Sequence, residues 1–135
     1  MNETMSPSIL LADDNWSVRK AMRTYLELTG FEICGEAADG IDAVAKATVL
    51  KPDFVILDLA MPGMNGFDAA RKLHETVPGA HLVVFTLYKD LVARPEAPQV
   101  GIDAVVSKAD GITALVEKMT SLMNSSAKWT PGPER

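Results

Sequence analysis

Five polar side chains stand at or just beyond the ends of short apolar runs in this sequence. Asp13 closes the run SILLAD and Asp14 follows it, while Asp58 closes DFVILD. A hydroxyl, Thr86, closes HLVVFT, and an ammonium group, Lys108, closes DAVVSK. Any one of them would be explained by a helix cap, a strand end or a surface charge. The repetition of the pattern over all five favours a shared chemical site.

The residue types indicate which chemistry this site supports. Three crowded carboxylates repel one another, and a bound cation relieves that repulsion. The ligand set is all oxygen, because neither histidine nor the single cysteine closes one of these runs, and hard oxygen ligands favour Mg²⁺ or Mn²⁺ over zinc. Lys108 and Thr86 add a positive charge and a hydroxyl, which suit a phosphoryl group. Asp58 is then a nucleophile that attacks phosphorus.

The apolar runs alternate with segments of helical periodicity. The predicted strands are 8–13, 31–37, 53–58, 81–86 and 103–108. The predicted helices lie between Asn15 as N-cap and Gly30, over 41–50 after a cap at Asp39, from Gly66 to the stop at Pro78-Gly79, and over 109–123. The inward faces predicted for the first two helices are Val18, Met22, Tyr25, Leu26 and Leu28, and Ile41, Val44, Ala45 and Val49.

Strands that alternate with helices predict an α/β fold built on a parallel sheet. The nearly unbroken apolar strand DFVILD is typical of a parallel sheet covered on both faces. Right-handed crossovers leave few topologies, and the flavodoxin-like order 2-1-3-4-5 is common at this size. We therefore expect a single doubly wound five-stranded sheet. Its first and third strands would be neighbours, which brings the three aspartates to the switch point where ligands bind.

Composition limits the remaining possibilities. A chain of 135 residues suggests one domain, and 13 basic against 18 acidic residues, net charge −5, disfavours a nucleic-acid surface. No apolar run reaches the ~20 residues of a membrane span. The start MNETMSPS lacks the basic and apolar parts of a secretory signal, so we expect a cytoplasmic protein. Residues 1–7 are predicted to be an N-terminal extension and 125–135 a flexible tail or linker stub.

With these motifs in order, the chain resembles the receiver domain of bacterial two-component response regulators. The resemblance rests on LLADDN, DFVILDLAMPGMNG, VVFT and VVSK and their spacing, and it covers nearly the whole chain, with a receiver domain over 8–124. LADDN and GEAADG are most similar to the subfamily of LuxR type, whose receivers usually precede a helix-turn-helix DNA-binding domain.

The resemblance implies a role for each motif residue. Asp58 would be the phosphoacceptor. Asp14 would bind Mg²⁺ directly, Asp13 through water, and the backbone carbonyl of Ala60 would be a further ligand.

Thr86 would bond the phosphoryl group and move inward, and Lys108 would pair with Asp58 or its phosphate. The implied donor is a sensor histidine kinase or a phosphotransfer protein. The implied output is a downstream protein target or a fused DNA-binding domain outside this chain. The domain itself would bind no nucleic acid and no membrane, and its only catalysis would be its own phosphorylation and dephosphorylation.

The sequence departs from the family pattern at several positions. Val105 stands where receivers usually carry an aromatic partner of the threonine. Pro95 and Pro98 predict a shortened or irregular fourth helix, because an interior proline costs about 3 kcal/mol or more. Ala109 stands where many receivers have a proline in a cis peptide bond. The peptide bond between Lys108 and Ala109 is therefore expected to be trans. Tyr88 either shields the acyl phosphate or is an ordinary surface aromatic.

Three other functions remain as alternatives. Val105 and the two prolines would also suit a receiver that no longer switches and acts as a protein-interaction module. A phosphatase of the haloacid dehalogenase type needs a second Asp two positions after its nucleophile, and Ala60 stands there. A flavin-binding flavodoxin needs Ser, Thr and Gly in its first loop, where LADDNW presents two carboxylates.

Overall fold

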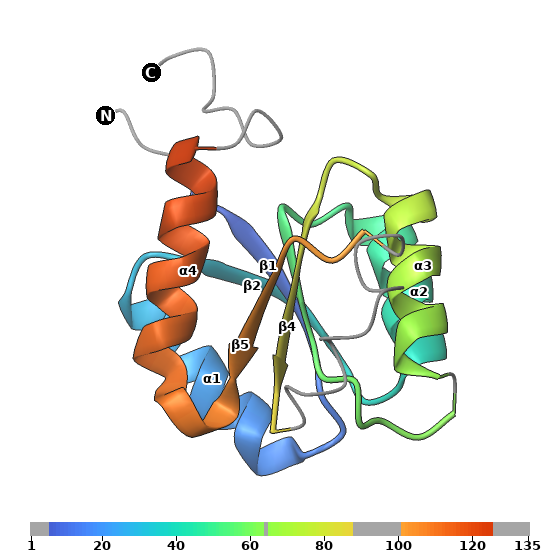
Figure 1. The fold of residues 1–135 in the computed structure, drawn as a ribbon, viewed down its shortest axis with the longest axis horizontal. Helices are drawn as coiled ribbons and strands as arrows, with labels where there is room; N and C mark the ends of the chain where they lie inside the picture. The colour runs from blue at the N-terminus through green and yellow to red at the C-terminus, as the bar shows by residue number, and fades with distance from the viewer. Residues whose placement is uncertain (1–5, 64, 88–100, 126–135) are drawn as a thin grey trace.

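Five parallel strands form one sheet in the order β2-β1-β3-β4-β5 in the computed structural model (Figure 1). The structure describes residues 6–63, 65–87 and 101–125. The strands are β1 (Ser8–Ala12), β2 (Glu32–Ala37), β3 (Phe54–Leu57), β4 (His81–Thr86) and β5 (Ala104–Ser107). The flavodoxin-like order expected from the sequence is therefore confirmed.

Helices cover both faces of the sheet, with α1 and α4 on one side and α2 and α3 on the other (Figure 1). They are α1 (Trp16–Leu28), α2 (Gly40–Leu50), α3 (Gly66–Thr76) and α4 (Gly111–Ser125), and a 3₁₀ turn, η3 (Lys108–Asp110), precedes α4. Two apolar clusters fill the layers, and alternate residues of each central strand point to opposite clusters. This explains why β3 is apolar at every position.

The helix caps predicted from the sequence are present. Asn15 Oδ1 accepts the backbone N–H of Val18 at 3.1 Å, and Asp39 Oδ1 accepts that of Asp42 at 2.7 Å. The last helix begins at Gly111 and not at residue 109, because Lys108–Asp110 first form η3. No cis peptide bond occurs among the described residues, so the bond before Ala109 is trans as expected.

The predicted inward face of α2 is wrong except at Val44, which is partly buried and packs against the core. Ile41 and Val49 are 61% and 79% exposed, whereas Ala43 and Ala47 are fully buried against the sheet. Small side chains let the helix backbone approach the sheet closely, so the buried stripe follows the alanines and not the largest residues. Leu28 of α1 is likewise 80% exposed, because Met22 and Leu26, four residues apart, define the buried face.

Several sequence predictions fall outside the described residues. They are the irregular helix around Pro95 and Pro98, the position of Tyr88, and most of the N-terminal extension and tail, at 1–5 and 126–135. Over the ranges that the structure does describe, no helix has the length and apolar character that crossing a membrane requires.

Candidate functional site

Asp13, Asp14 and Asp58, hereafter the acidic cluster, meet at the carboxyl ends of β1 and β3. The N–H of Asp58 donates to Ala12 O at 2.9 Å and that of Asp13 to Ala37 O at 3.0 Å, which extends the sheet pairing by one residue. One carboxylate oxygen from each aspartate lies within 4.8 Å of the others. The three aspartates that the sequence predicted to share a site are therefore adjacent.

Lys108 joins the acidic cluster from the far side of β4. Its Nζ donates to Asp13 Oδ2 at 2.6 Å and to Asp58 Oδ2 at 2.8 Å. The three side chains are 16%, 4% and 8% exposed, in the order Lys108, Asp13 and Asp58. The ammonium group is therefore a largely buried bridge between the two carboxylates.

The charge state of Lys108 follows from two opposing effects. Burial lowers the pKa of an amine, but the hydrogen bonds and charges of Asp13 and Asp58 outweigh it and raise the pKa of Lys108 above its usual value. Lys108 is thus a fixed cation at neutral pH. It offsets one of the three negative charges of the acidic cluster, so an excess of negative charge remains for a divalent cation.

The other oxygen of each buried carboxylate is held by a tight turn. Asp13 Oδ1 accepts the N–H of Asn15 at 2.9 Å, and Asp58 Oδ1 accepts the N–H of Ala60 at 3.0 Å. Both turns orient the second oxygen toward Lys108. The donor set fits Mg²⁺, since it consists of carboxylate oxygens. Ala60 lies at the exposed turn beside Asp58, and its role as a ligand stays a prediction.

Thr86 is the last residue of β4 and is fully buried between the ends of β3 and β5. In the register of the sheet, Thr86 pairs with Ser107 and Val84 pairs with Val105. Val105 therefore lies on the same face of the sheet as Thr86, one diagonal step away. It is half-buried and packs against the apolar cluster under α2 and α3. An aliphatic side chain thus occupies the position beside the threonine.

An ion-pair network that the sequence did not predict lies next to the acidic cluster. Glu36 of β2 accepts Arg19 Nε at 2.9 Å and Arg23 Nη1 at 2.5 Å. Burial raises the pKa of Glu36, but the hydrogen bonds and charges of the two arginines dominate and hold it below its usual value. The only sequence signal for this network was the pair of arginines four residues apart on α1, since the shared acidic partner lies on another element.

The network predicts a specific pH dependence of stability. A carboxyl whose pKa is depressed in the folded state stabilises the protein above its ordinary value, 4.5, and loses that contribution as the pH falls through the folded pKa. Wild type should therefore exceed Glu36→Gln in free energy of unfolding at pH 7, and the difference should narrow below pH 4.5. Urea titrations across this range measure it.

The matched control is Glu117→Gln, at an exposed position of α4, where a change below about 0.5 kcal/mol is expected. A gap between wild type and Glu36→Gln that stays constant with pH would contradict the assignment.

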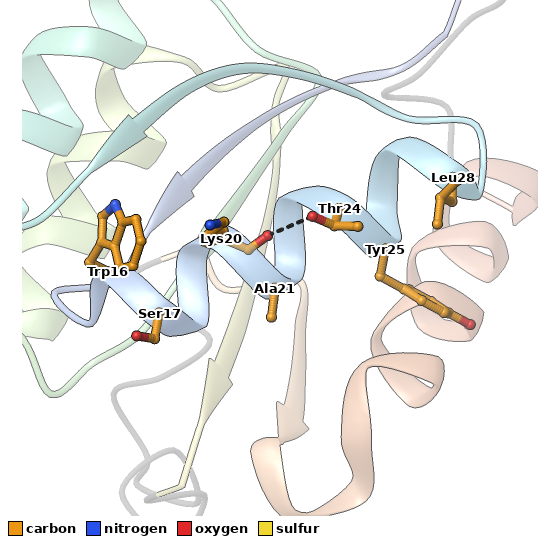
Figure 2. A pocket seen from close by; sticks show the side chains of 7 residues that line it. All are labelled: Trp16, Ser17, Lys20, Ala21, Thr24, Tyr25 and Leu28. Atoms are coloured by element: carbon orange, nitrogen blue, oxygen red, sulfur yellow. Dashed lines mark hydrogen bonds between the residues drawn. The ribbon is translucent and has the colours of Figure 1, made fainter.

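A groove with a volume of about 480 Å³ runs along the outer face of α1, hereafter the α1 groove. Figure 2 shows Trp16 at one end of the groove, and Tyr25 and Leu28 at the other end, on the side of α4. Trp16 is 62% exposed, and Lys20 Nζ lies 5.1 Å from its ring centroid. The groove therefore exposes apolar surface beginning two residues after Asp14.

Comparisons with known proteins identify the family and the fold of this chain. The family model described as the response regulator receiver domain matches residues 9–120. The chemotaxis protein CheY of Thermotoga maritima is 30% identical over 118 residues, which cover 87% of this chain and 98% of that protein. The response regulator protein VraR of Staphylococcus saprophyticus is 28% identical over 124 residues, 91% of this chain but only 59% of VraR.

A similar solved structure is that of a two-component response regulator of the LuxR family from Aurantimonas sp. SI85-9A1. It superposes with a TM-score of 0.80 at 27% identity, covering 89% of this chain and 86% of that one. The similarity thus extends over the sheet and over the strand ends that carry the acidic cluster.

Proposed function

Because the chain belongs to the response regulator receiver family, we propose that it accepts a phosphoryl group on Asp58 in a Mg²⁺-dependent reaction and then changes its protein-binding surface. Receivers of this family act in phosphorylation-dependent signalling. The observation that carries the assignment of the acceptor is the pairing of Asp58 with Lys108 inside the acidic cluster. We assign the receiver to residues 8–124.

The reaction follows from the positions of the side chains. A carboxylate oxygen of Asp58 attacks phosphorus, and the bond from phosphorus to the leaving atom of the donor breaks as the new P–O bond forms. Asp14, Asp58 and the carbonyl of Ala60, with Asp13 acting through water, would hold Mg²⁺, which would supply positive charge for the phosphoryl oxygens. Lys108, which pairs with Asp13 and Asp58 before the reaction, then pairs with the phosphoryl group and with Asp13.

Thr86 is proposed to carry the response. Its side chain is buried at the end of β4, one strand from Asp58, so its hydroxyl is the natural partner of a phosphoryl oxygen at the strand ends. Leu87, the next residue, is 65% exposed, so a movement of Thr86 would alter the surface directly. Val105 leaves this movement without the usual aromatic partner.

The half-buried Val105 also favours a second candidate, a receiver that serves as an interaction module without switching. Amide exchange of β4 and β5 before and after phosphorylation separates the two. The switching receiver predicts changed exchange at Thr86 and its neighbours. The interaction module predicts an unchanged exchange pattern and an unchanged affinity for its partner.

The proposed partners follow from the α1 groove and from the family of the chain. We propose that the donor is a sensor histidine kinase or phosphotransfer protein whose apolar helix docks on the α1 groove, since the groove begins at Trp16, two residues after Asp14. The output is a downstream protein target or a fused DNA-binding domain outside this chain. This is compatible with the match to VraR, in which the aligned residues cover only 59% of VraR. The proposed location is the cytoplasm.

The direct test uses acetyl phosphate as donor. Wild type incubated with acetyl phosphate and Mg²⁺ is expected to gain the mass of one phosphoryl group, and EDTA should prevent the gain. Asp58→Asn should gain none, because the amide is not a nucleophile toward phosphorus. Intact-protein mass spectrometry measures the gain. Equal labelling of wild type and Asp58→Asn would refute the assignment.

A further inference from the structure

Arg19 links the acidic cluster to the neighbouring strand β2. Its side chain, from the first turns of α1, is 14% exposed. Nη1 donates to the backbone carbonyl of Asp13 at 2.6 Å, and Nε donates to Glu36 Oε1 at 2.9 Å. The planar guanidinium therefore bridges the end of β1 and the end of β2 with two hydrogen bonds in a fixed geometry.

The contact with Asp13 controls the direction of the chain through the acidic cluster. The carbonyl of Asp13 and the N–H of Asp14 belong to one planar peptide unit, so a bond that holds the carbonyl also fixes the orientation in which Asp14 begins. The other polar groups of Asp13 already have partners, namely Ala37 O, Asn15 N and Lys108 Nζ. Arg19 completes this set and fixes both aspartates relative to each other.

We propose that Arg19 is a positioning residue for Mg²⁺ binding, acting through the Asp13 carbonyl on the carboxylates of Asp13 and Asp14. The inference rests on the proposed function, because it concerns the metal of that same site. Outer partners that orient metal ligands contribute to affinity without touching the metal. Glu36 offsets the charge of Arg19, so the guanidinium orients the loop without strongly repelling a cation.

The charge of Arg19 and its positioning of the loop have opposite effects on the affinity for Mg²⁺, so an experiment can separate them. Removing the positive charge of Arg19 would strengthen the binding of a cation, whereas loosening the loop would weaken it. Arg19→Lys keeps the charge but lacks the planar fork that reaches both Asp13 and Glu36. Arg23→Lys is the matched control, because Arg23 pairs with Glu36 and Glu27, and within the part of the chain that the structure describes no ion pair joins it to the acidic cluster.

The experiment titrates the full chain with MgCl₂ by isothermal titration calorimetry. Arg19→Lys should raise the Kd for Mg²⁺ about 10-fold, and Arg23→Lys should leave it unchanged. Both variants lose a contact with Glu36, so their thermal unfolding midpoints should fall similarly. The rate of labelling by acetyl phosphate should be slow in Arg19→Lys at low Mg²⁺ and return to the wild-type rate at saturating Mg²⁺.

Arg19→Gln tests independently whether the affinity for Mg²⁺ rises or falls when the guanidinium is lost. Loss of charge alone would make it bind Mg²⁺ more tightly than wild type, whereas loss of positioning makes it bind more weakly. Three results would each overturn the inference: a wild-type Kd for Mg²⁺ in Arg19→Lys, an equal rise of the Kd in both lysine variants, or tighter Mg²⁺ binding by Arg19→Gln. In each case the proposed function would stand, provided that wild type is still labelled on Asp58. If wild type itself neither binds Mg²⁺ nor gains a phosphoryl group, the proposed function fails first and the inference with it.

Discussion

Lys108→Met is expected to lower the free energy of unfolding by about 3 kcal/mol at neutral pH in metal-free buffer. Removing one partner of a buried ion pair leaves the other charge uncompensated, which costs about 3–5 kcal/mol. Here two carboxylates, of Asp13 and Asp58, lose the same ammonium group. The lower end of the range applies because Lys108 is 16% exposed and water can partly replace it. Chemical denaturation in EDTA measures the effect.

Mg²⁺ should reverse much of this loss. Without Lys108 the acidic cluster carries more net negative charge, so a divalent cation should bind the folded state more tightly and stabilise the variant more than wild type. The control is Lys118→Met, an exposed position on α4, where a change below about 0.5 kcal/mol is expected. If Lys108→Met is as stable as wild type in EDTA, the bridge does not compensate the aspartates.

Gly66→Ala is expected to lower the free energy of unfolding by about 2 kcal/mol. A Cβ at Gly66 would lie 2.8 Å from both the Cα and the carbonyl oxygen of Leu59, backbone atoms that cannot turn away. Overpacking of this kind costs about 1–3 kcal/mol, and it outweighs the roughly 1 kcal/mol that alanine gains over glycine in a helix. Because Leu59 directly follows Asp58, the displaced backbone should also slow labelling by acetyl phosphate.

Gly79→Ala is the matched control for this prediction. No atom lies within 4 Å of a Cβ at Gly79, and its φ is not positive, so the substitution should be neutral or stabilising by about 0.4–1 kcal/mol. Urea unfolding and the labelling rate of both variants give the comparison. If Gly66→Ala has the stability and the labelling rate of wild type, the backbone of the turn after Asp58 moves to accommodate the added Cβ without cost, and the prediction is wrong.

The architecture and the main site follow from local features of the sequence. Alternation of apolar runs with amphipathic segments, together with right-handed crossovers, leaves few sheet orders, and the expected one is present. Because parallel strands end at one edge, residues that close such runs must approach one another. This is why Asp13, Asp58 and Lys108, distant in sequence, were predictable as neighbours.

The features missed by the sequence reasoning depend on distances between elements. Periodicity predicts an inward face of α2 made of Ile41, Val44, Ala45 and Val49, whereas the packing distance to the sheet selects Ala43 and Ala47. The α1 groove exists because α1 buries only a narrow stripe, which leaves Trp16 and Leu28 at the surface. Neither outcome follows from periodicity alone, since periodicity gives a face but not how closely that face approaches its neighbour.

The sequence by itself determined the order of the strands, the identity of the acidic cluster and the chemistry open to it, because residue type and position along a strand fix these. Only the tertiary structure decided that Lys108 bridges two carboxylates and that Arg19 holds the carbonyl of Asp13. Long side chains choose among several partners, and that choice depends on where α1, β2 and β5 place their backbones in space.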